Sequence, residues 1–347
     1  MMSDCANAIS AIANDDYVST IAKKIVVGEV SNDEVKGLIN FFHLNGISTM
    51  ELLALAITFY RASIPSYTSF PAVADLCGTG GGCVRTFNIS TAASFVVAGC
   101  GVPVAKHGNR SNAGKSGSAD VIEALGARLN LGPILPSQIL NEIGYSFFYA
   151  PVFNPAMKNV AAARKEVGGR TVFNLLGPLL NPVRTKRRQL IGVSDASLLD
   201  TLPSIIEAIG IDRCMLIHGS PGMDEASTLG PTEAVFIKKG NRERFTIYPR
   251  ELGLCEGNKE AICDRSPLNS AILIRNILHK GEPNEAKEIV LLNAACALMA
   301  FGIAQDVEQG LRLAERSILT GRAAKKMEIF VSLTRKYKEG KLNDRCF

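Results

Sequence analysis

The sequence predicts an α/β fold, with a small helical domain at the N-terminus and a larger α/β domain after it. Two capping-box sequences within the first 65 residues each introduce a helix. Short apolar segments then alternate with helix-like segments between residues 72 and 248, which is typical of strands joined by crossover helices. Long helices return after residue 270. We place the boundary near residue 68, which gives domains of residues 1–68 and 69–347.

The N-terminal domain is predicted to contain helices only. Residues 31–34 (Ser-Asn-Asp-Glu) and 48–51 (Ser-Thr-Met-Glu) have the capping-box spacing, and apolar residues follow each at helical period. Gly46 ends the first of these helices. Residues 66–71 lose the periodicity and gain proline, so they predict a hinge into the second domain.

Strands of the second domain are predicted where short apolar segments are bounded by turn residues. Helix-like segments between the first five predict crossover connections, and the last two strands predict an added hairpin. The predicted strands cover residues 72–77, 101–105, 147–150, 189–193, 214–218, 235–238 and 244–248. Helices of the C-terminal part are predicted at residues 289–299 and 307–318.

Composition favours a soluble, cytoplasmic enzyme. The chain has 347 residues, 47% of them hydrophobic, and no apolar run reaches membrane-spanning length. The first five residues carry neither a basic region nor an apolar segment, which argues against a secretory signal. Nine scattered cysteines without a Cys-x-x-Cys pair predict reduced thiols.

Charge does not favour a nucleic-acid partner. The formal net charge of +5 is a mild excess for this length and suits anionic small-molecule substrates. The densest basic run, residues 184–188, has no interleaved aromatic residues to stack on bases. We predict a solvated loop there, with contact to phosphate or nucleic acid as the alternative.

Two glycine-bearing loops predict a phosphate site. Residues 78–82 read Gly-Thr-Gly-Gly-Gly and continue to 88–91 (Asn-Ile-Ser-Thr) between a predicted strand and a predicted helix, where backbone N–H groups would face an anion. The first loop alone could equally be an ordinary turn, because it matches neither the dinucleotide nor the nucleoside-triphosphate fingerprint. The polar segment 106–118, with Lys106 and Arg110, favours the phosphate site.

Three further features suggest ligand chemistry. Asp224 and Glu225 follow a predicted strand and suit Mg²⁺, although a solvated acidic turn has the same pattern. Arg164 could bind a carboxylate bidentately, or be an exposed helix arginine. His107 lies inside the second loop, whereas His218 is expected to be a hydrogen-bonded structural residue.

Five segments, taken in order, resemble the anthranilate phosphoribosyltransferase family. They are residues 75–91, 101–126, 147–151, 164–182 and 218–227, and the similarity extends over nearly the whole chain. The resemblance implies a helical domain beside an α/β domain of the nucleoside phosphorylase/phosphoribosyltransferase class III type, and a homodimer. It also implies Mg²⁺-dependent transfer of the phosphoribosyl group of phosphoribosyl pyrophosphate to anthranilate, in tryptophan biosynthesis. The products would be N-(5-phosphoribosyl)anthranilate and pyrophosphate.

The resemblance also implies roles for individual residues. No side chain would act as a nucleophile, so catalysis would rest on positioning and electrostatics. Phosphoribosyl pyrophosphate would be bound by Gly78, Gly81, Gly82, Thr86, Asn88, Ile89, Ser90, Thr91, Lys106 and Ser118. Anthranilate would contact Gly78, His107, Asn109, Arg164, Gly177 and Pro178. Magnesium would be held around Ser90, Asp224 and Glu225.

The chain departs from the family pattern at three places. Gly82 and Cys83 stand where the family usually has Asp-Gly, so a loop carboxylate is missing. Residues 112–114 (Asn-Ala-Gly) replace a stretch that usually contains serine, and Asn154 replaces a histidine near the anthranilate path. We expect these departures to affect the number of metal ions, the affinity for pyrophosphate and the binding of the acceptor.

Two alternatives to the anthranilate enzyme stay open at this point. A non-catalytic paralogue of the same fold could bind nucleic acid or other polyanions through the basic loops, but it would need neither the acidic pair nor Arg164. A pyrimidine nucleoside phosphorylase is disfavoured by the Asn109 and Arg164 pair. The expected homodimer would use apolar faces of the helical domain around Phe41, Phe42 and Phe59.

Overall fold

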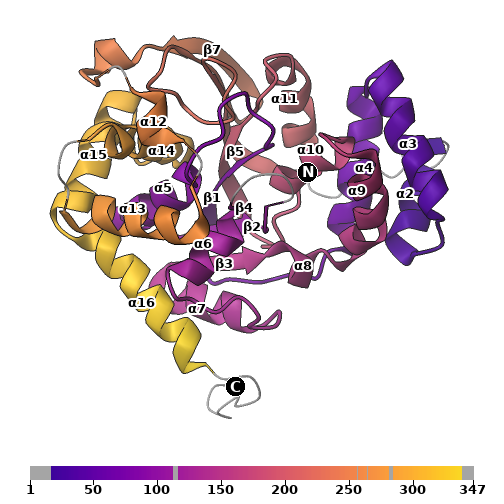
Figure 1. Cartoon of the computed structure of the whole chain (residues 1–347), viewed down its shortest axis with the longest axis horizontal. Helices are drawn as coiled ribbons and strands as arrows, with labels where there is room; N and C mark the ends of the chain where they lie inside the picture. The colour runs from indigo at the N-terminus through magenta and orange to yellow at the C-terminus, as the bar shows by residue number, and fades with distance from the viewer. Residues whose placement is uncertain (1–16, 112–115, 256, 264, 281–283, 338–347) are drawn as a thin grey trace.

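The computed structural model describes residues 17–111, 116–255, 257–263, 265–280 and 284–337 (Figure 1). The features predicted in residues 1–5 and 112–114 therefore lie outside the described residues. Within the described ranges, no helix is long and apolar enough to cross a membrane. The seven cysteines in these ranges are free thiols, as predicted.

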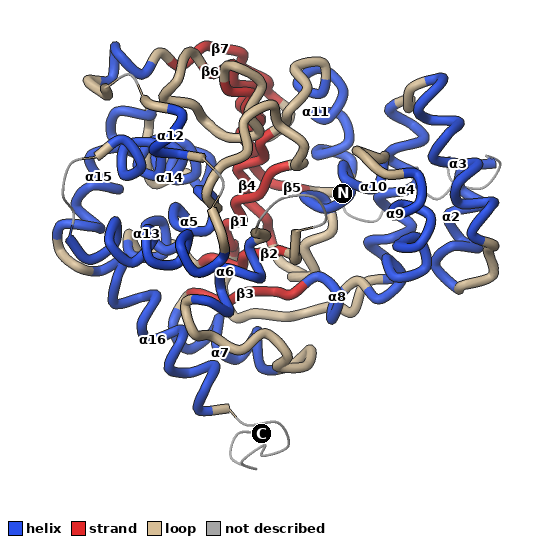
Figure 2. Tube along the Cα trace, viewed as in Figure 1, coloured by secondary structure: helices blue, strands red, loops and turns tan. Residues whose placement is uncertain are grey.

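A seven-stranded sheet in the order β3-β2-β1-β4-β5-β6-β7 forms the centre of the molecule (Figure 2). Strands β1 to β5 run parallel, and β6 and β7 form an antiparallel hairpin at one edge. All seven predicted strands are confirmed, with shifted ends that are clearest at β2. Their bounds are β1 (Ala72–Gly78), β2 (Val104–Gly108), β3 (Tyr145–Tyr149), β4 (Lys186–Gly192), β5 (Ile211–Gly219), β6 (Thr232–Lys238) and β7 (Asn241–Ile247).

Helices cover both faces of this sheet (Figure 1). One face packs against a core formed with α5 (Ile89–Gly99), α6 (Ser118–Ala124), α7 (Leu135–Ile143), α13 (Pro267–Lys280), α14 (Glu285–Phe301), α15 (Val307–Leu319) and α16 (Arg322–Lys336). The short helix α12 (Lys259–Ile262) contacts α14. Helix α14 is buried on most sides, which explains why its sequence is apolar rather than amphipathic.

The other face packs against a core that includes the N-terminal helices α2 (Tyr17–Val27), α3 (Asn32–Asn45) and α4 (Thr49–Ala62). Both predicted capping boxes are present, at the starts of α3 and α4. The same core takes in residues of later segments: η1 (Pro155–Val160), α9 (Ala161–Val167), α10 (Val172–Leu176), η2 (Gly177–Leu179) and α11 (Leu198–Ala208). The short helix α8 (Ala150–Phe153) leads from β3 into η1, and η3 (Pro249–Leu252) follows β7.

Two of the three aromatic residues expected on a dimer face are internal. Phe42 and Phe59 are buried in the core of the N-terminal helices, and Phe59 contacts Phe173 edge to face. Phe41 is exposed, as is Leu44 one helical turn further on. Helical period alone does not distinguish a face that packs internally from one that packs on a partner.

The prediction of a solvated loop at residues 184–188 is wrong, because the run leads into β4. Arg187 is buried and donates to the carbonyl oxygens of Leu179 (3.1 Å) and Ile209 (3.2 Å). The guanidinium of Arg184 lies 3.7 Å from the ring centroid of Tyr60, on α4. The aromatic partner comes from a segment more than 120 residues earlier, so the local pattern could not show it.

Candidate functional site

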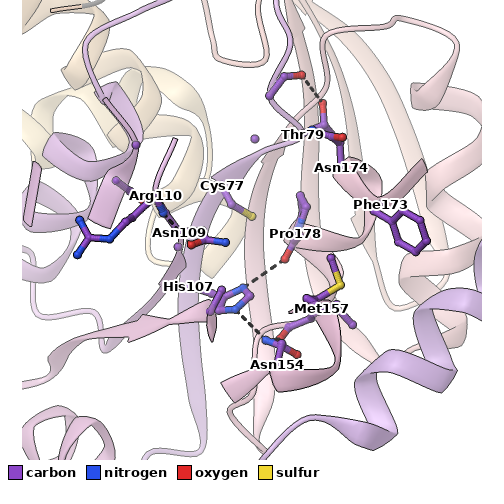
Figure 3. Close-up of a pocket in the computed structure, with 18 of the residues that line it drawn as sticks. Cys77, Thr79, His107, Asn109, Arg110, Asn154, Met157, Phe173, Asn174 and Pro178 are labelled. Atoms are coloured by element: carbon purple, nitrogen blue, oxygen red, sulfur yellow. Dashed lines mark hydrogen bonds between the residues drawn. The ribbon is translucent and has the colours of Figure 1, made fainter. Parts of the chain in front are cut away.

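A cavity of about 710 Å³ lies beyond the carboxyl ends of β1 and β2, between the sheet and the segment from α8 to η2 (Figure 3). This is the usual position of a ligand in an open α/β sheet. Segments far apart in the sequence meet there. The predicted site residues that line the cavity are Gly78, Asn88, Ser90, Lys106, His107, Asn109, Ser118, Arg164, Gly177, Pro178 and Asp224.

The remaining predicted site residues lie around this cavity rather than in its wall. Ile89 and Thr91 are fully buried in α5. Thr86 and Glu225 contact each other through their side chains. Substrate contact for this group stays a prediction; its members are Gly81, Gly82, Thr86, Ile89 and Thr91.

The glycines of the first loop have different roles. A Cβ on Gly78 would lie 2.1 Å from Oδ2 of Asp224, so only glycine fits there. Gly80 and Gly81 have φ angles of 71° and 79°, a region that glycine adopts at low cost. Gly82 is outside that region, but its Cβ would lie 3.0 Å from the carbonyl oxygen of Gly222 and 3.3 Å from Oδ1 of Asp224. The family carboxylate that is missing at Gly82 would therefore stand next to the acidic pair.

Asp224 and Glu225 are held below the first glycine loop. Asp224 accepts a hydrogen bond from the backbone N–H of Gly80 (2.7 Å), and Glu225 accepts one from the Thr86 hydroxyl (2.6 Å). Both side chains are partly buried, whereas the sequence also allowed a solvated turn. Desolvation raises the pKa of both carboxyls, and the adjacent charge of Asp224 helps to raise the pKa of Glu225 to about 8.

These carboxylates fit Mg²⁺ and do not form a complete metal cage. Within the described ranges no three His, Cys, Asp or Glu side chains gather to hold a metal ion by themselves. Mg²⁺ in phosphate sites typically takes one or two carboxylates and completes its shell with water and phosphate oxygens. The donor set therefore suits a cation that arrives with a phosphorylated substrate.

Lys106 supplies a buried positive charge beside the acidic pair. Its ammonium group donates to the carbonyl oxygen of Leu76 (2.7 Å) and to the Ser90 hydroxyl (3.3 Å). Burial lowers the pKa of Lys106, and the charge of Asp75 opposes this shift. Asp75 is itself buried and accepts from the backbone N–H of His107 (3.2 Å) and the Asn181 amide (2.8 Å). We did not select Asp75 from the sequence, because a single acid in a strand has no local signature.

Arg110, expected to add charge to the phosphate site, is paired elsewhere. Its guanidinium contacts the carboxylates of Asp120 (2.8 Å) and Glu123 (2.6 Å) on α6. Arg110 lines the cavity, but in Figure 3 its guanidinium points away from His107 and Pro178. These ion pairs hold Arg110 against α6, while Lys106 supplies a positive charge in the cavity wall.

Arg164 lies at the other end of the cavity. Its guanidinium donates to the Asn174 side-chain oxygen (3.3 Å), and burial lowers its pKa. Among the described residues no carboxylate forms an ion pair with it, so a cation without a counter-ion lies beside Phe173 and Met157. A partly buried cation beside apolar side chains suits an aromatic acid.

Arg170 is a further cation that we did not predict. Its guanidinium donates to the Thr79 hydroxyl (3.2 Å), and its side chain passes over Gly81. Its charge opposes the rise that burial causes in the pKa of Asp224. His43 of α3 contacts the Arg170 carbonyl oxygen through Nε2 (2.8 Å), which joins the N-terminal helices to this segment. His218 contacts the Val193 carbonyl oxygen through Nδ1 (2.8 Å), in the structural role we expected.

Comparison with known proteins agrees with the residues in the cavity. Residues 71–324 match the family model of the glycosyl transferase family, a/b domain. Anthranilate phosphoribosyltransferase of Moorella thermoacetica is 42% identical over 89% of this chain and 90% of its own. The enzyme of that name from Methanosphaerula palustris is 41% identical over 93% of this chain and 96% of its own.

The chain belongs to the anthranilate phosphoribosyltransferase family. The structure of the anthranilate phosphoribosyltransferase of Thermus thermophilus has a TM-score of 0.85, with 35% identity over 92% of this chain and 94% of that one. The Saccharomyces cerevisiae enzyme in complex with phosphoribosyl pyrophosphate and Mg has a TM-score of 0.80, with 25% identity over 88% of this chain and 86% of that one. Membership of the anthranilate phosphoribosyltransferase family confirms the predicted fold class.

Proposed function

We propose that this chain transfers the phosphoribosyl group of phosphoribosyl pyrophosphate to the amine of anthranilate, releasing pyrophosphate, as a step of tryptophan biosynthesis. One observation carries the proposal within this family. A single cavity has Lys106 and Asp224 of the acidic pair at one end, and at the other Arg164, which forms no ion pair with a described residue, beside apolar side chains. The two ends suit a phosphorylated sugar and an aromatic acid.

The phosphate end would hold the pyrophosphate leaving group. Asp224, Glu225 and Ser90 would hold Mg²⁺, which would neutralise charge on the pyrophosphate. Lys106 and the backbone N–H groups of the first glycine loop would bind the remaining phosphate oxygens. Breaking the bond at C1 of the ribose builds positive charge on the sugar and negative charge on the leaving group. Donors arranged in advance lower this barrier.

The aromatic end would orient the acceptor. Arg164 would bind the anthranilate carboxylate, with Asn109 beside it, and Pro178 and Phe173 would line the ring. An arylamine is a modest nucleophile, so holding its nitrogen near C1 supplies much of the acceleration. No side-chain nucleophile is needed.

We further propose a cytoplasmic homodimer built through the helical domain of residues 1–68. The exposed Phe41 and Leu44 on α3 support such a contact. Residues of η1, α9 and α10 pack in the same core as the N-terminal helices. This packing supports a helical unit that includes later segments of the chain.

The test is loss of anthranilate fluorescence after addition of phosphoribosyl pyrophosphate and Mg²⁺. We expect turnover with all three components and none when Mg²⁺ is chelated. Gel-shift measurements with single- and double-stranded DNA and RNA address the polyanion alternative. Nucleic-acid binding without turnover would overturn the proposal.

A further inference from the structure

The side chains of His107 and Asn154 contact each other in the wall of the cavity (Figure 3). The Nε2 atom of His107 lies 3.1 Å from Nδ2 of Asn154, and its Nδ1 atom lies 3.2 Å from the carbonyl oxygen of Gly177. Both side chains are buried. The mechanism above gives neither ring nitrogen a task.

The hydrogen bonds determine which ring nitrogen carries the proton. A carbonyl oxygen only accepts, so Nδ1 of His107 must donate to Gly177. The amide nitrogen of Asn154 also lies 3.3 Å from the Leu180 carbonyl oxygen, to which it donates. The same NH₂ group therefore faces Nε2, which must accept. His107 is thus neutral, with its proton on Nδ1.

Rotating the Asn154 amide would break this arrangement. Its oxygen would then face the Leu180 carbonyl oxygen, and two acceptors would meet. A neutral ring with its proton on Nε2 would also leave Nδ1 facing the Gly177 carbonyl oxygen without a proton. The observed orientation satisfies three contacts and leaves one atom, Oδ1 of Asn154, buried with no hydrogen-bond partner among the described residues. One unsatisfied buried oxygen costs less than losing the other contacts together.

The charged groups around His107 do not favour a second proton. Burial lowers its pKa most strongly, and the charges of Lys106 and Arg187 lower it further. The Asp75 charge and the hydrogen bond to Gly177 act in the opposite direction. Protonation would also place an Nε2–H against the NH₂ group of Asn154, donor against donor.

We propose that Asn154 is a positioning residue that holds His107 as the neutral Nδ1–H tautomer, so that His107 shapes the anthranilate path without exchanging a proton with the substrate. An amide does not titrate, so Asn154 presents the same NH₂ group to Nε2 at every pH. His107 then accepts no proton from the arylamine. Because His107 stays neutral in the parent protein, the use of anthranilate does not change with pH through its titration. The kinetic part of this inference rests on the proposed function, whereas the assignment of the tautomer does not.

Nitrogen-15 NMR of the histidine rings tests the tautomer without any activity. The chain has four histidines, so loss of one signal in His107→Gln assigns its resonances. We expect the His107 ring to keep the Nδ1–H pattern between about pH 5.5 and 8.5, on both sides of the ordinary histidine pKa. An Nε2–H pattern, or titration with an ordinary midpoint in the parent protein, would overturn the proposal.

Asn154→Asp provides the converse experiment. A carboxylate accepts where the amide donates, so both ring nitrogens of His107 should become protonated and its pKa should rise by roughly one unit or more. Asn159→Asp is the matched control, because Asn159 lies in η1 and donates to Ile25 instead. An unchanged His107 spectrum in folded Asn154→Asp would contradict the proposal.

Kinetics separate positioning from a purely structural role. In measurements at saturating Mg²⁺, the kcat/KM for anthranilate should be flat across the histidine range in the parent protein. In Asn154→Asp it should fall as pH rises, because loss of the His107 proton leaves a buried carboxylate that repels the acceptor. The KM for phosphoribosyl pyrophosphate should stay constant in both. A parent profile that falls on the acid side with the His107 midpoint would show proton exchange and refute the inference. Absence of turnover in both proteins would refute the proposed function and leave the NMR result standing.

Discussion

The two ends of the cavity are built in different ways. The phosphate end comes mainly from residues at or just after the ends of two neighbouring parallel strands, β1 and β2, and the acidic pair follows β5. The aromatic end is assembled from side chains on η1, α9, α10 and η2, which also pack on the N-terminal helices. A site made of loops at strand ends can be recognised locally, whereas a site made by packing depends on the fold.

The largest effect is expected at the acidic pair. Asp224→Asn combined with Glu225→Gln removes the charges that would hold Mg²⁺, so turnover should fall by at least about a thousandfold, as when a principal electrostatic contact is removed. Desolvation already disfavours both charges, so neutral amides should leave the melting temperature nearly unchanged. Steady-state kinetics and thermal melting measure the two effects. Near-parental turnover in the double variant would show that Asp224 and Glu225 do not hold the metal ion.

Arg164→Ala should affect the aromatic end alone. Losing a charge-assisted contact of about 1.5–3 kcal/mol lowers kcat/KM for anthranilate by roughly 10- to 150-fold. The KM for phosphoribosyl pyrophosphate should change little. Lys165→Ala is a suitable control, since Lys165 is the exposed neighbour of Arg164 on α9. Equal losses for both substrates would mean that the two ends do not act separately.

The pH dependence of Mg²⁺ binding should also distinguish the two ends, because the titrating carboxyls lie at the phosphate end. Burial and the neighbouring carboxylate raise the pKa of Glu225 to about 8, so the pair retains a proton below that pH. Metal binding needs the deprotonated form. The apparent affinity for Mg²⁺ should therefore increase with pH, by up to about tenfold per unit, and level off above pH 8. Calorimetric titration in buffers of different ionisation enthalpy would also detect the released proton; constant affinity from pH 6 to 8 would contradict the shift.

The same contrast explains how much of the site could be predicted from sequence. The glycine loop and the Asp224–Glu225 pair have short-range signatures. The strands that precede them, β1 and β5, were predicted correctly except for their end residues. Asp75 and Arg170 were missed because their partners, Asn181 and Thr79, lie about 90 residues or more away. The basic run at residues 184–188 was misread because Tyr60, which stacks on Arg184, lies on α4, more than 120 residues earlier in the sequence.

The smallest expected effect tests the missing carboxylate of the first loop. Gly82 does not need a positive φ, so strain is not a reason for glycine there. A Cβ at this position would meet the Gly222 carbonyl oxygen at 3.0 Å and Oδ1 of Asp224 at 3.3 Å, which is close but can be relieved by a small shift of the loop. Gly82→Ala should therefore lower activity modestly at every Mg²⁺ concentration.

Gly82→Asp adds a third carboxylate beside the acidic pair. Three carboxylates together with a phosphate can recruit a further cation. The Mg²⁺ curve of Gly82→Asp should change shape, whereas that of Gly82→Ala should keep the parental shape. At low Mg²⁺ the new charge repels Asp224 and the pyrophosphate, so activity should fall below that of Gly82→Ala and recover as Mg²⁺ increases. Titration of both variants and the parent with Mg²⁺ at fixed substrate makes the comparison. Parallel curves would show that the space beside Gly222, and not the absent charge, accounts for glycine at this position.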